Sequence, residues 1–162
     1  MPANPMTETS MFSIEEIMRF VPHRYPFLLI DRVLDFTENQ SVTTLKNVTI
    51  NEAHFAGHFP KKPIFPGVYL IENMAQSACF LLARSAGKLE DNVVYVLGKV
   101  NKMSFTAPVY PGDQVITRVI LEKKFGDAAL VSGVACVADR TMAKGELMFS
   151  VIRENADSPS CA

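Results

Sequence analysis

Three residues that lie close together in the sequence could support acid–base chemistry. His58 sits in the polar run 57–60, and Gly67 and Glu72 follow in the longest apolar segment of the chain. Histidine and carboxylic acids are side chains that enzymes commonly use to move protons. Glycine allows a close approach to the backbone because it has no Cβ atom. Nothing else in the 162 residues brings a histidine, such a glycine and an isolated acid so near one another.

The apolar segment that begins at Pro66 is expected to form one long helix. Pro66 suits a first helical turn, where its missing N–H would have no partner, and Gly87 suits the end. Some twenty residues at about 1.5 Å each span roughly 30 Å, about the diameter of a small domain. The helix should therefore be central, although its polar residues interrupt it too often for a membrane span. Its apolar stripe, with a period of 3.6 residues, consists of Ile71, Met74, Ala75, Ala78, Cys79 and Leu82.

Glu72 is expected to lie on a second face of this helix. It shares that face with Gln76, Tyr69 and Phe80, at least about a quarter turn from the apolar stripe. Most helical glutamates are solvated, so an ordinary surface position is one interpretation. Two aromatic neighbours argue against it, because a water-facing strip rarely carries two aromatic rings.

His58 is expected in a loop, since Gly57, Pro60 and further prolines disfavour helix on both sides of it. The spacing of His54 and His58 would suit two metal ligands on one helical face, but we expect no helix there. The three cysteines are far apart and form no CxxC pair, so no metal site is expected. His23 could be functional, although a structural or surface role is the preferred interpretation.

Composition indicates one globular domain with a full core. Apolar residues make up 48% of the chain and charged residues 20%, and the net charge of −1 argues against nucleic acid as a main partner. The N-terminus lacks a basic flank followed by an apolar run, so no secretory signal is expected. Cys79, Cys136 and Cys161 are interpreted as reduced thiols of a cytoplasmic protein.

The remaining patterns predict an α+β fold with one antiparallel sheet wrapped around the long helix. A capping box at Ser13 and Glu16 predicts a short helix that reaches about Phe20. Gly133 and Ala135 leave one strand face small, as expected where a helix packs closely on a sheet. The expected strands are 27–34, 41–50, 93–97, 99–105, 114–125, 128–138 and 146–152.

We expect a flexible leader at 1–11, one domain at 12–153 and a flexible tail at 154–162. A curved sheet that covers part of such a helix leaves apolar surface to bury. A homodimer with strands paired across an edge would cover that surface and protect the edge.

Several of these motifs together resemble the FabZ type of 3-hydroxyacyl-[acyl-carrier-protein] dehydratase. The similarity extends from about Phe20 to Ile152. Its most specific part is the pattern GHFPxxPxxPGV with a glutamate fourteen residues after the histidine. The matching segments are Pro22–Arg32, Asn51–Glu52, Gly57–Pro60, Pro63, Pro66–Val68, Glu72, Met74–Gln76 and Pro111–Gln114.

The resemblance implies a hot-dog fold, a dimer grouped as a trimer of dimers, and an active site between two protomers. The implied reaction converts (3R)-3-hydroxyacyl-[acyl-carrier-protein] to the trans-2-enoyl product in fatty-acid or related acyl-chain biosynthesis. His58 and Glu72 would be the catalytic residues, from different protomers, and the Gly67 amide would polarise the substrate carbonyl. The expected substrate-binding residues are Gly67, Phe59, Val68, Tyr69 and Gln76.

The implied partner is acyl carrier protein, whose phosphopantetheine carries the substrate, and no cofactor, nucleic acid or membrane insertion is expected. Basic residues that could receive this acidic partner are Lys61, Lys62, Arg84, Lys99 and Lys102. Two other functions remain open at this stage. A hot-dog thioesterase would release a thiol instead of forming an alkene, and a non-catalytic acyl-binding protein would bind without turnover.

Overall fold

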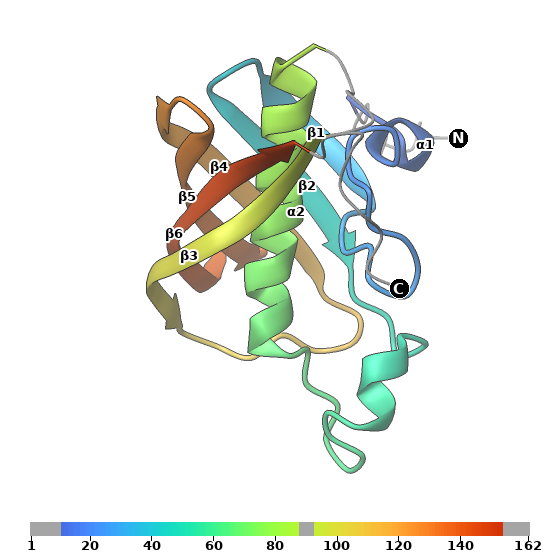
Figure 1. Cartoon of the computed structure of the whole chain (residues 1–162). Helices are drawn as coiled ribbons and strands as arrows, with labels where there is room; N and C mark the ends of the chain where they lie inside the picture. The colour runs from blue at the N-terminus through green and yellow to red at the C-terminus, as the bar shows by residue number, and fades with distance from the viewer. Residues whose placement is uncertain (1–10, 88–92, 154–162) are drawn as a thin grey trace, which may run out of the picture.

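The computed structural model describes residues 11–87 and 93–153, which form one antiparallel sheet curved around a long helix (Figure 1). The expected α+β architecture is therefore confirmed. The leader 1–10, the connector 88–92 and the tail 154–162 lie outside the described residues. In chain order the elements are α1 (Ile14–Ile17), β1 (Arg32–Thr37), β2 (Ser41–Asn47), the 3-10 helix η1 (Ala53–Ala56), α2 (Gly67–Ser85), β3 (Val93–Phe105), β4 (Gln114–Phe125), β5 (Ala128–Val137) and β6 (Arg140–Arg153).

The sheet has the strand order β1-β2-β4-β5-β6-β3, and every neighbouring pair is antiparallel. Hairpins join β4 to β5 and β5 to β6, with Gly126 at a positive φ of 56° in the first turn. The strand β3 follows α2 in the chain yet pairs with β6 at the far edge. The helix α2 thus lies between the β1-β2 side of the sheet and the β3 side, which places it in the concave face.

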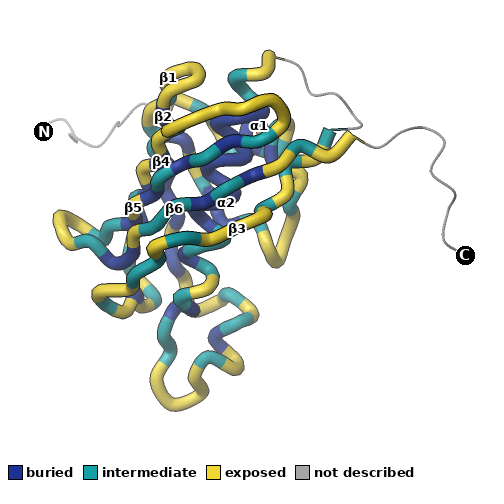
Figure 2. Tube along the Cα trace, turned by 60° about the vertical axis from the view of Figure 1, so that its left-hand side comes forward, coloured by how far each residue is buried: buried dark blue, intermediate teal, exposed yellow. Residues whose placement is uncertain are grey.

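Burial confirms that α2 is the centre of the core. Met74, Ala78, Phe80 and Leu81 have no exposed surface, and Figure 2 shows the helix enclosed by the strands. The sequence predicts small side chains on one face of the strand at Gly133, and this is the point where α2 approaches β5. A Cβ atom on Gly133 would lie 3.0 Å from the sulfur of Met74, so a side chain there would press on the helix. None of the described helices is long and apolar enough to cross a membrane.

The predicted strand at 27–34 begins later, at Arg32. Residues 27–29 belong to no strand, and side chains of α2 bind their backbone groups. Gln76 accepts from the Leu29 N–H at 2.8 Å and donates to the Phe27 carbonyl at 2.7 Å. Asn73 donates to the Leu29 carbonyl at 2.7 Å. The segment is therefore fixed to the helix and not to a neighbouring strand.

Other boundaries differ from the sequence-based predictions for local reasons. The first helix ends at Ile17 and continues as a turn to Phe20, although the Ser13 N–H donates to Glu16 at 2.8 Å as the capping box requires. The two strands predicted at 93–105 form one strand, whose ladder shifts between Leu97 and Lys99. The last strand starts at 140 because residues 138–139 already turn the chain, with Ala138 at a φ of 49°.

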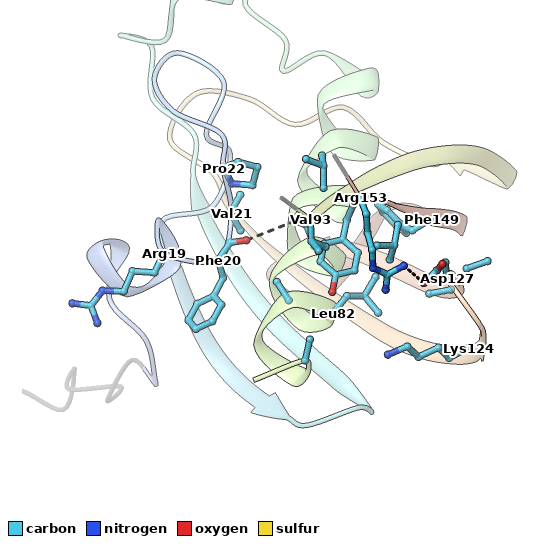
Figure 3. Close-up of a pocket in the computed structure, with 18 of the residues that line it drawn as sticks. Arg19, Phe20, Val21, Pro22, Leu82, Val93, Lys124, Asp127, Phe149 and Arg153 are labelled. Atoms are coloured by element: carbon cyan, nitrogen blue, oxygen red, sulfur yellow. Dashed lines mark hydrogen bonds and ion pairs between the residues drawn. The ribbon is translucent and has the colours of Figure 1, made fainter. Parts of the chain in front are cut away.

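A cavity of about 490 Å³ lies beside the C-terminal half of α2 (Figure 3). Leu82 of α2, Phe149 of β6 and the loop around Phe20 contribute to its walls. Arg153 pairs with Asp127 at 2.8 Å on its rim. His58, Gly67 and Glu72 are not among the residues that line it.

Candidate active site

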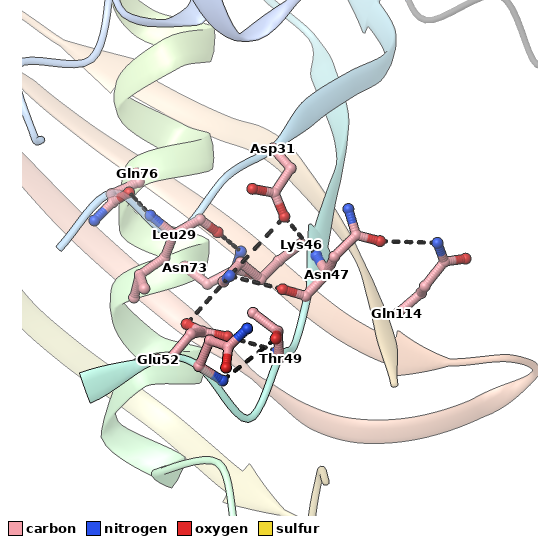
Figure 4. Close-up of polar contacts among 10 residues, drawn as sticks. Leu29, Asp31, Lys46, Asn47, Thr49, Glu52, Asn73, Gln76 and Gln114 are labelled. Atoms are coloured by element: carbon pink, nitrogen blue, oxygen red, sulfur yellow. Dashed lines mark hydrogen bonds and ion pairs between the residues drawn. The ribbon is translucent and has the colours of Figure 1, made fainter. Parts of the chain in front are cut away.

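The loop that carries His58 projects from one end of the fold and is anchored by a buried lysine (Figures 1 and 4). The ammonium of Lys46, on β2, lies 3.2 Å from a carboxylate oxygen of Glu52 and 3.9 Å from one of Asp31. Glu52 in turn accepts from the backbone N–H of Thr49 at 2.9 Å. The side chain of Lys46 is only 7% exposed, so these contacts are poorly screened by water. They fix the start of the loop to the sheet.

His58 follows η1, with its imidazole held by one nitrogen. Nδ1 lies 2.8 Å from the carbonyl oxygen of Ile64, which can only accept a hydrogen bond. In a neutral imidazole the hydrogen therefore sits on Nδ1, and Nε2 keeps a lone pair for a proton from another molecule. The ring stacks on Phe59 with centroids 4.0 Å apart. The histidine is thus oriented as a base.

His58 and Gly67 line the same cavity, which has a volume of about 350 Å³. Gly67 is the first residue of α2, and the N-cap residue Pro66 supplies no side-chain hydrogen bond. The N–H groups of Gly67 and Val68 have no hydrogen-bond acceptor among the described residues, as expected at an uncapped helix start. Such groups favour an anion or a polarised oxygen. The cavity is lined by His58, Ile64, Phe65, Gly67, Leu70, Phe105, Thr106, Ala107, Pro108 and Val109.

Gly67 also has a packing reason to lack a side chain. A Cβ atom there would lie 3.2 Å from the Phe105 ring, which is tighter than most contacts of this kind. Phe105 lies at the end of β3 and lines the same cavity. The aromatic ring and the helix start therefore form adjacent walls of the site.

Glu72 lies on another side of α2 and is only partly exposed. Its Oε1 accepts from Gln76 Nε2 at 2.9 Å and lies 3.2 Å from His23 Nε2. The side chains of Glu72 and His23 are 21% and 31% exposed. Within this chain Glu72 is therefore half-buried, with two side-chain contacts on Oε1. No local sequence pattern indicated the contact between His23 and Glu72, because the two residues are far apart in the chain.

His58 and Glu72 share no hydrogen bond or ion pair among the described residues, and Glu72 is absent from the lining of the His58 cavity. Helix geometry explains the separation from Gly67. Five residues of an α-helix advance about 7.5 Å along the axis and turn by about 140°. Within one chain, Gly67 therefore lies with His58 and Glu72 lies with His23.

The other sequence-predicted site residues divide into two groups. Phe59 and Val68 are 51% and 66% exposed at the same end of the fold. Tyr69 packs edge-on against Phe27, with ring centroids 5.7 Å apart. Gln76 is fully buried and its amide binds the chain itself, as described above. Its position supports Glu72 directly, while contact of these four residues with a substrate stays a prediction.

A short 3-10 helix forms at Ala53–Ala56, because the N–H groups of Phe55 and Gly57 find acceptors on Glu52 and His54. It ends before His58, so no helix carries His54 and His58 together, as expected. The imidazole of His54 lies 4.9 Å from the Tyr69 ring, and its Nε2 is buried without a hydrogen-bond partner in the described structure. Loss of solvent lowers the pKa of His54, opposed by the Glu52 carboxylate. The described residues hold no group of three or more side chains suited to bind a metal.

The basic residues predicted to receive an acidic partner do not form one group. Lys61 and Lys62 are exposed in the loop after His58. Lys102 pairs with Glu146 at 2.8 Å. Arg84 lies near the other end of α2, with its guanidinium 5.6 Å from the centre of the Phe20 ring. Lys61 and Lys62 are therefore the members of this set nearest in sequence to His58.

The sequence is similar to known proteins over most of its length. Residues 21–148 match the model of the FabA-like domain. The chain is 45% identical over 148 residues to the 3-hydroxyacyl-[acyl-carrier-protein] dehydratase FabZ of Cronobacter sakazakii, which covers 91% of this chain and 98% of that protein. The same protein of Erwinia tasmaniensis shows the same identity and coverage.

Solved structures confirm the fold. A chain of the dehydratase heterocomplex ApeI:P from Xenorhabdus doucetiae superimposes with a TM-score of 0.72 at 17% identity, over 86% of this chain and 91% of that one. An uncharacterized protein from Pyrococcus horikoshii gives a TM-score of 0.59 at 16% identity, over 83% and 92% of the two chains. The architecture is the hot-dog fold, and the chain belongs to the FabA-like family, within its FabZ-type dehydratases.

Proposed function

We propose that the protein removes water from a 3-hydroxyacyl thioester carried on acyl carrier protein. The C2–H bond breaks, its electron pair forms the C2=C3 double bond, and the C3–O bond breaks. One proton leaves C2 and another joins the departing hydroxyl, so the products are an enoyl thioester and water. The observation that carries the proposal is the shared cavity of His58 and Gly67, at the start of the central helix.

His58 suits the base in this reaction. Its Nδ1 is committed to the Ile64 carbonyl, which leaves Nε2 to accept the C2 proton. As that proton leaves, negative charge grows on the thioester oxygen. The free N–H of Gly67 would stabilise this charge, helped by the positive end of α2. General bases of this kind contribute about 10²–10⁴-fold to rates.

Glu72 suits the group that protonates the departing hydroxyl or orients the departing water. Its separation from the His58 cavity within one chain supports a site that two protomers complete. The edge strand β3 supports such a dimer, since Val94, Val96 and Val100 are each close to 40% exposed along it. A trimer of these dimers is the larger assembly that we propose by analogy with the family.

Acyl carrier protein is the proposed partner, and its phosphopantetheine arm delivers the substrate. The reaction as written is redox-neutral and asks the protein only to accept one proton and supply another, so the residues named here suffice without a cofactor. The exposed Lys61 and Lys62 stand beside His58 in the sequence and would attract an acidic carrier. Cys79 and Cys136 are free thiols, which fits action in the reducing cytoplasm.

The test is conversion of 3-hydroxyacyl thioesters of several chain lengths on acyl carrier protein, followed by mass loss of one water. The native chain should form the enoyl product, and His58→Ala should abolish most turnover. Release of free thiol without an alkene would instead identify a thioesterase. Binding of the acyl carrier without either product would identify a non-catalytic binding protein. Either result would overturn the dehydratase proposal.

A further inference from the structure

The contact between His23 and Glu72 adds a residue to the site. His23 Nε2 and Gln76 Nε2 both approach the same carboxylate oxygen, Oε1 of Glu72, at 3.2 and 2.9 Å. Oε2 has no hydrogen-bond or ion-pair partner among the described residues. Two contacts on one oxygen fix the rotation of the carboxyl group. They leave the other oxygen as the atom that can reach a substrate.

The hydrogen of the His23 imidazole can be placed from its surroundings. Nδ1 of His23 is buried and has no hydrogen-bond partner in the described part of the chain. A buried N–H without an acceptor is rare in folded proteins, whereas a buried lone pair without a donor is tolerated more often. The neutral imidazole with its hydrogen on Nε2 therefore suits this site best. The N–H of Nε2 then faces Glu72 Oε1, at an N···O distance of 3.2 Å.

The turn that carries His23 is held rigidly at both ends. Before it, the Arg24 guanidinium donates to the carbonyl oxygens of Met18 and Val21, each at 2.9 Å. After it, Gln76 donates to the carbonyl of Phe27 at 2.7 Å. The Gln76 amide that fixes the turn is thus the same group that contacts Glu72. The imidazole and the carboxylate are positioned by one shared support.

We infer that His23 is a positioning residue for Glu72. The imidazole holds the Glu72 carboxyl group so that Oε2 faces the departing hydroxyl. The contact itself follows from the geometry alone. Its consequence for turnover rests on the proposed dehydratase function. A displacement of a catalytic group by about 1 Å can cost up to about 100-fold in rate, so the loss of this contact should be measurable in kcat.

Two variants separate the polar contact of the ring with Glu72 from the volume of the ring. His23→Gln keeps an N–H donor at the end of the side chain, and His23→Phe keeps an aromatic ring without a donor. His23→Phe should lower kcat for dehydration by about 10-fold to 100-fold with KM within about 2-fold. His23→Gln should recover most of the loss. Tyr25→Phe, an exposed substitution in the same turn, should match the native enzyme. Equal kcat for His23→Phe and the native enzyme would overturn the inference.

A double-mutant cycle distinguishes positioning from a general structural effect. With Glu72→Gln already present, His23→Phe should cause little further loss, because the group that it positions can no longer act. The same fold-loss in both backgrounds would show that His23 supports the fold and not Glu72. Thermal unfolding of each variant confirms that the proteins compared are folded.

The contact can also be tested without turnover, which keeps this inference separate from the proposed function. In protein labelled with 15N-histidine, the side-chain signals of His23 should show hydrogen on Nε2 and should shift in Glu72→Gln. The signals are assigned by their loss in His23→Gln. If the His23 signals differ between the native protein and Glu72→Gln but the native protein does not dehydrate the substrate, only the proposed function is refuted. An unshifted His23 signal refutes the contact, whatever the activity.

Discussion

The imidazole of His58 is oriented by Ile64, whose carbonyl oxygen lies 2.8 Å from Nδ1. Ile64 is six residues further along the same loop, so the loop itself determines which nitrogen is free. The acceptor is a backbone carbonyl, so the interaction does not depend on the chemical type of the side chain at position 64. The base atom is Nε2 because of the path of the backbone.

His58→Ala should lower kcat by about 10²–10⁴-fold, the usual contribution of a general base. The side chain is only partly buried, so the midpoint of thermal unfolding should change little. The measurement is steady-state dehydration together with a melting curve for each protein. A variant with near-native kcat would remove His58 from the mechanism.

Glu52→Gln should weaken the anchor of the catalytic loop. The buried ammonium of Lys46 would lose the carboxylate at 3.2 Å and keep only the more distant one of Asp31. We expect the free energy of unfolding to fall by about 1–3 kcal/mol, and kcat to fall with it because His58 is less well held. Urea unfolding and dehydration assays measure the two effects.

The double variant Lys46→Met with Glu52→Gln serves as the control for that loss. It removes the buried charge that Glu52→Gln leaves incompletely paired, and it should be more stable than Glu52→Gln alone. If both proteins unfold at the same urea concentration, the ion pair does not anchor the loop.

Gly133→Val should destabilise the core, because α2 leaves no room for a side chain on β5. Even the Cβ atom would lie 3.0 Å from the sulfur and 3.2 Å from Cγ of Met74. Overpacking of this kind costs about 1–3 kcal/mol. Gly133→Ala should cost less, since the flexible Met74 can shift. Urea unfolding of both variants gives the comparison, and equal stability of Gly133→Val and the native protein would contradict the close approach.

Acid should reduce stability partly through His54. Burial lowers its pKa in the folded state, so the neutral imidazole is favoured there and the unfolded chain binds the proton more readily. The stability that the neutral His54 contributes is present above the pKa of the unfolded chain, about 6.5. It is lost as the pH falls through the pKa of the folded state. Between pH 7 and 5, His54→Phe should therefore lose less stability than the native protein. If the free energy of unfolding of both proteins falls equally with pH in that range, His54 has no such role.

Cys79 should resist alkylation in the folded protein. Cys79 lies on α2, and its burial in the core raises the pKa of its thiol to about 12. The Glu72 carboxylate adds to the rise. The nucleophilic thiolate is therefore scarce at pH 8. Iodoacetamide followed by peptide mass analysis should modify Cys79 only after urea is added. Rapid labelling without urea would show that this end of the core opens readily.

The sequence by itself determined the elements and the nature of the chemistry. The period of 3.6 residues after Pro66 predicted α2, alternation and turn residues predicted most strands, and the GHFP run with Glu72 pointed to acid–base catalysis. These features depend on residues near one another in the chain. They can therefore be recognised without knowing how the chain packs.

Only the tertiary structure decided which side chains serve the site and how. Gln76 is 47 positions from Leu29 and 49 from Phe27, yet it makes hydrogen bonds with the backbone of both. These hydrogen bonds replace the expected strand, and the same amide supports Glu72. His23 meets Glu72 by the same packing. No local pattern encodes such pairs, because each polar group could be satisfied by water in the unfolded chain. Burial against α2 removes the water and leaves these partners as the ones within reach.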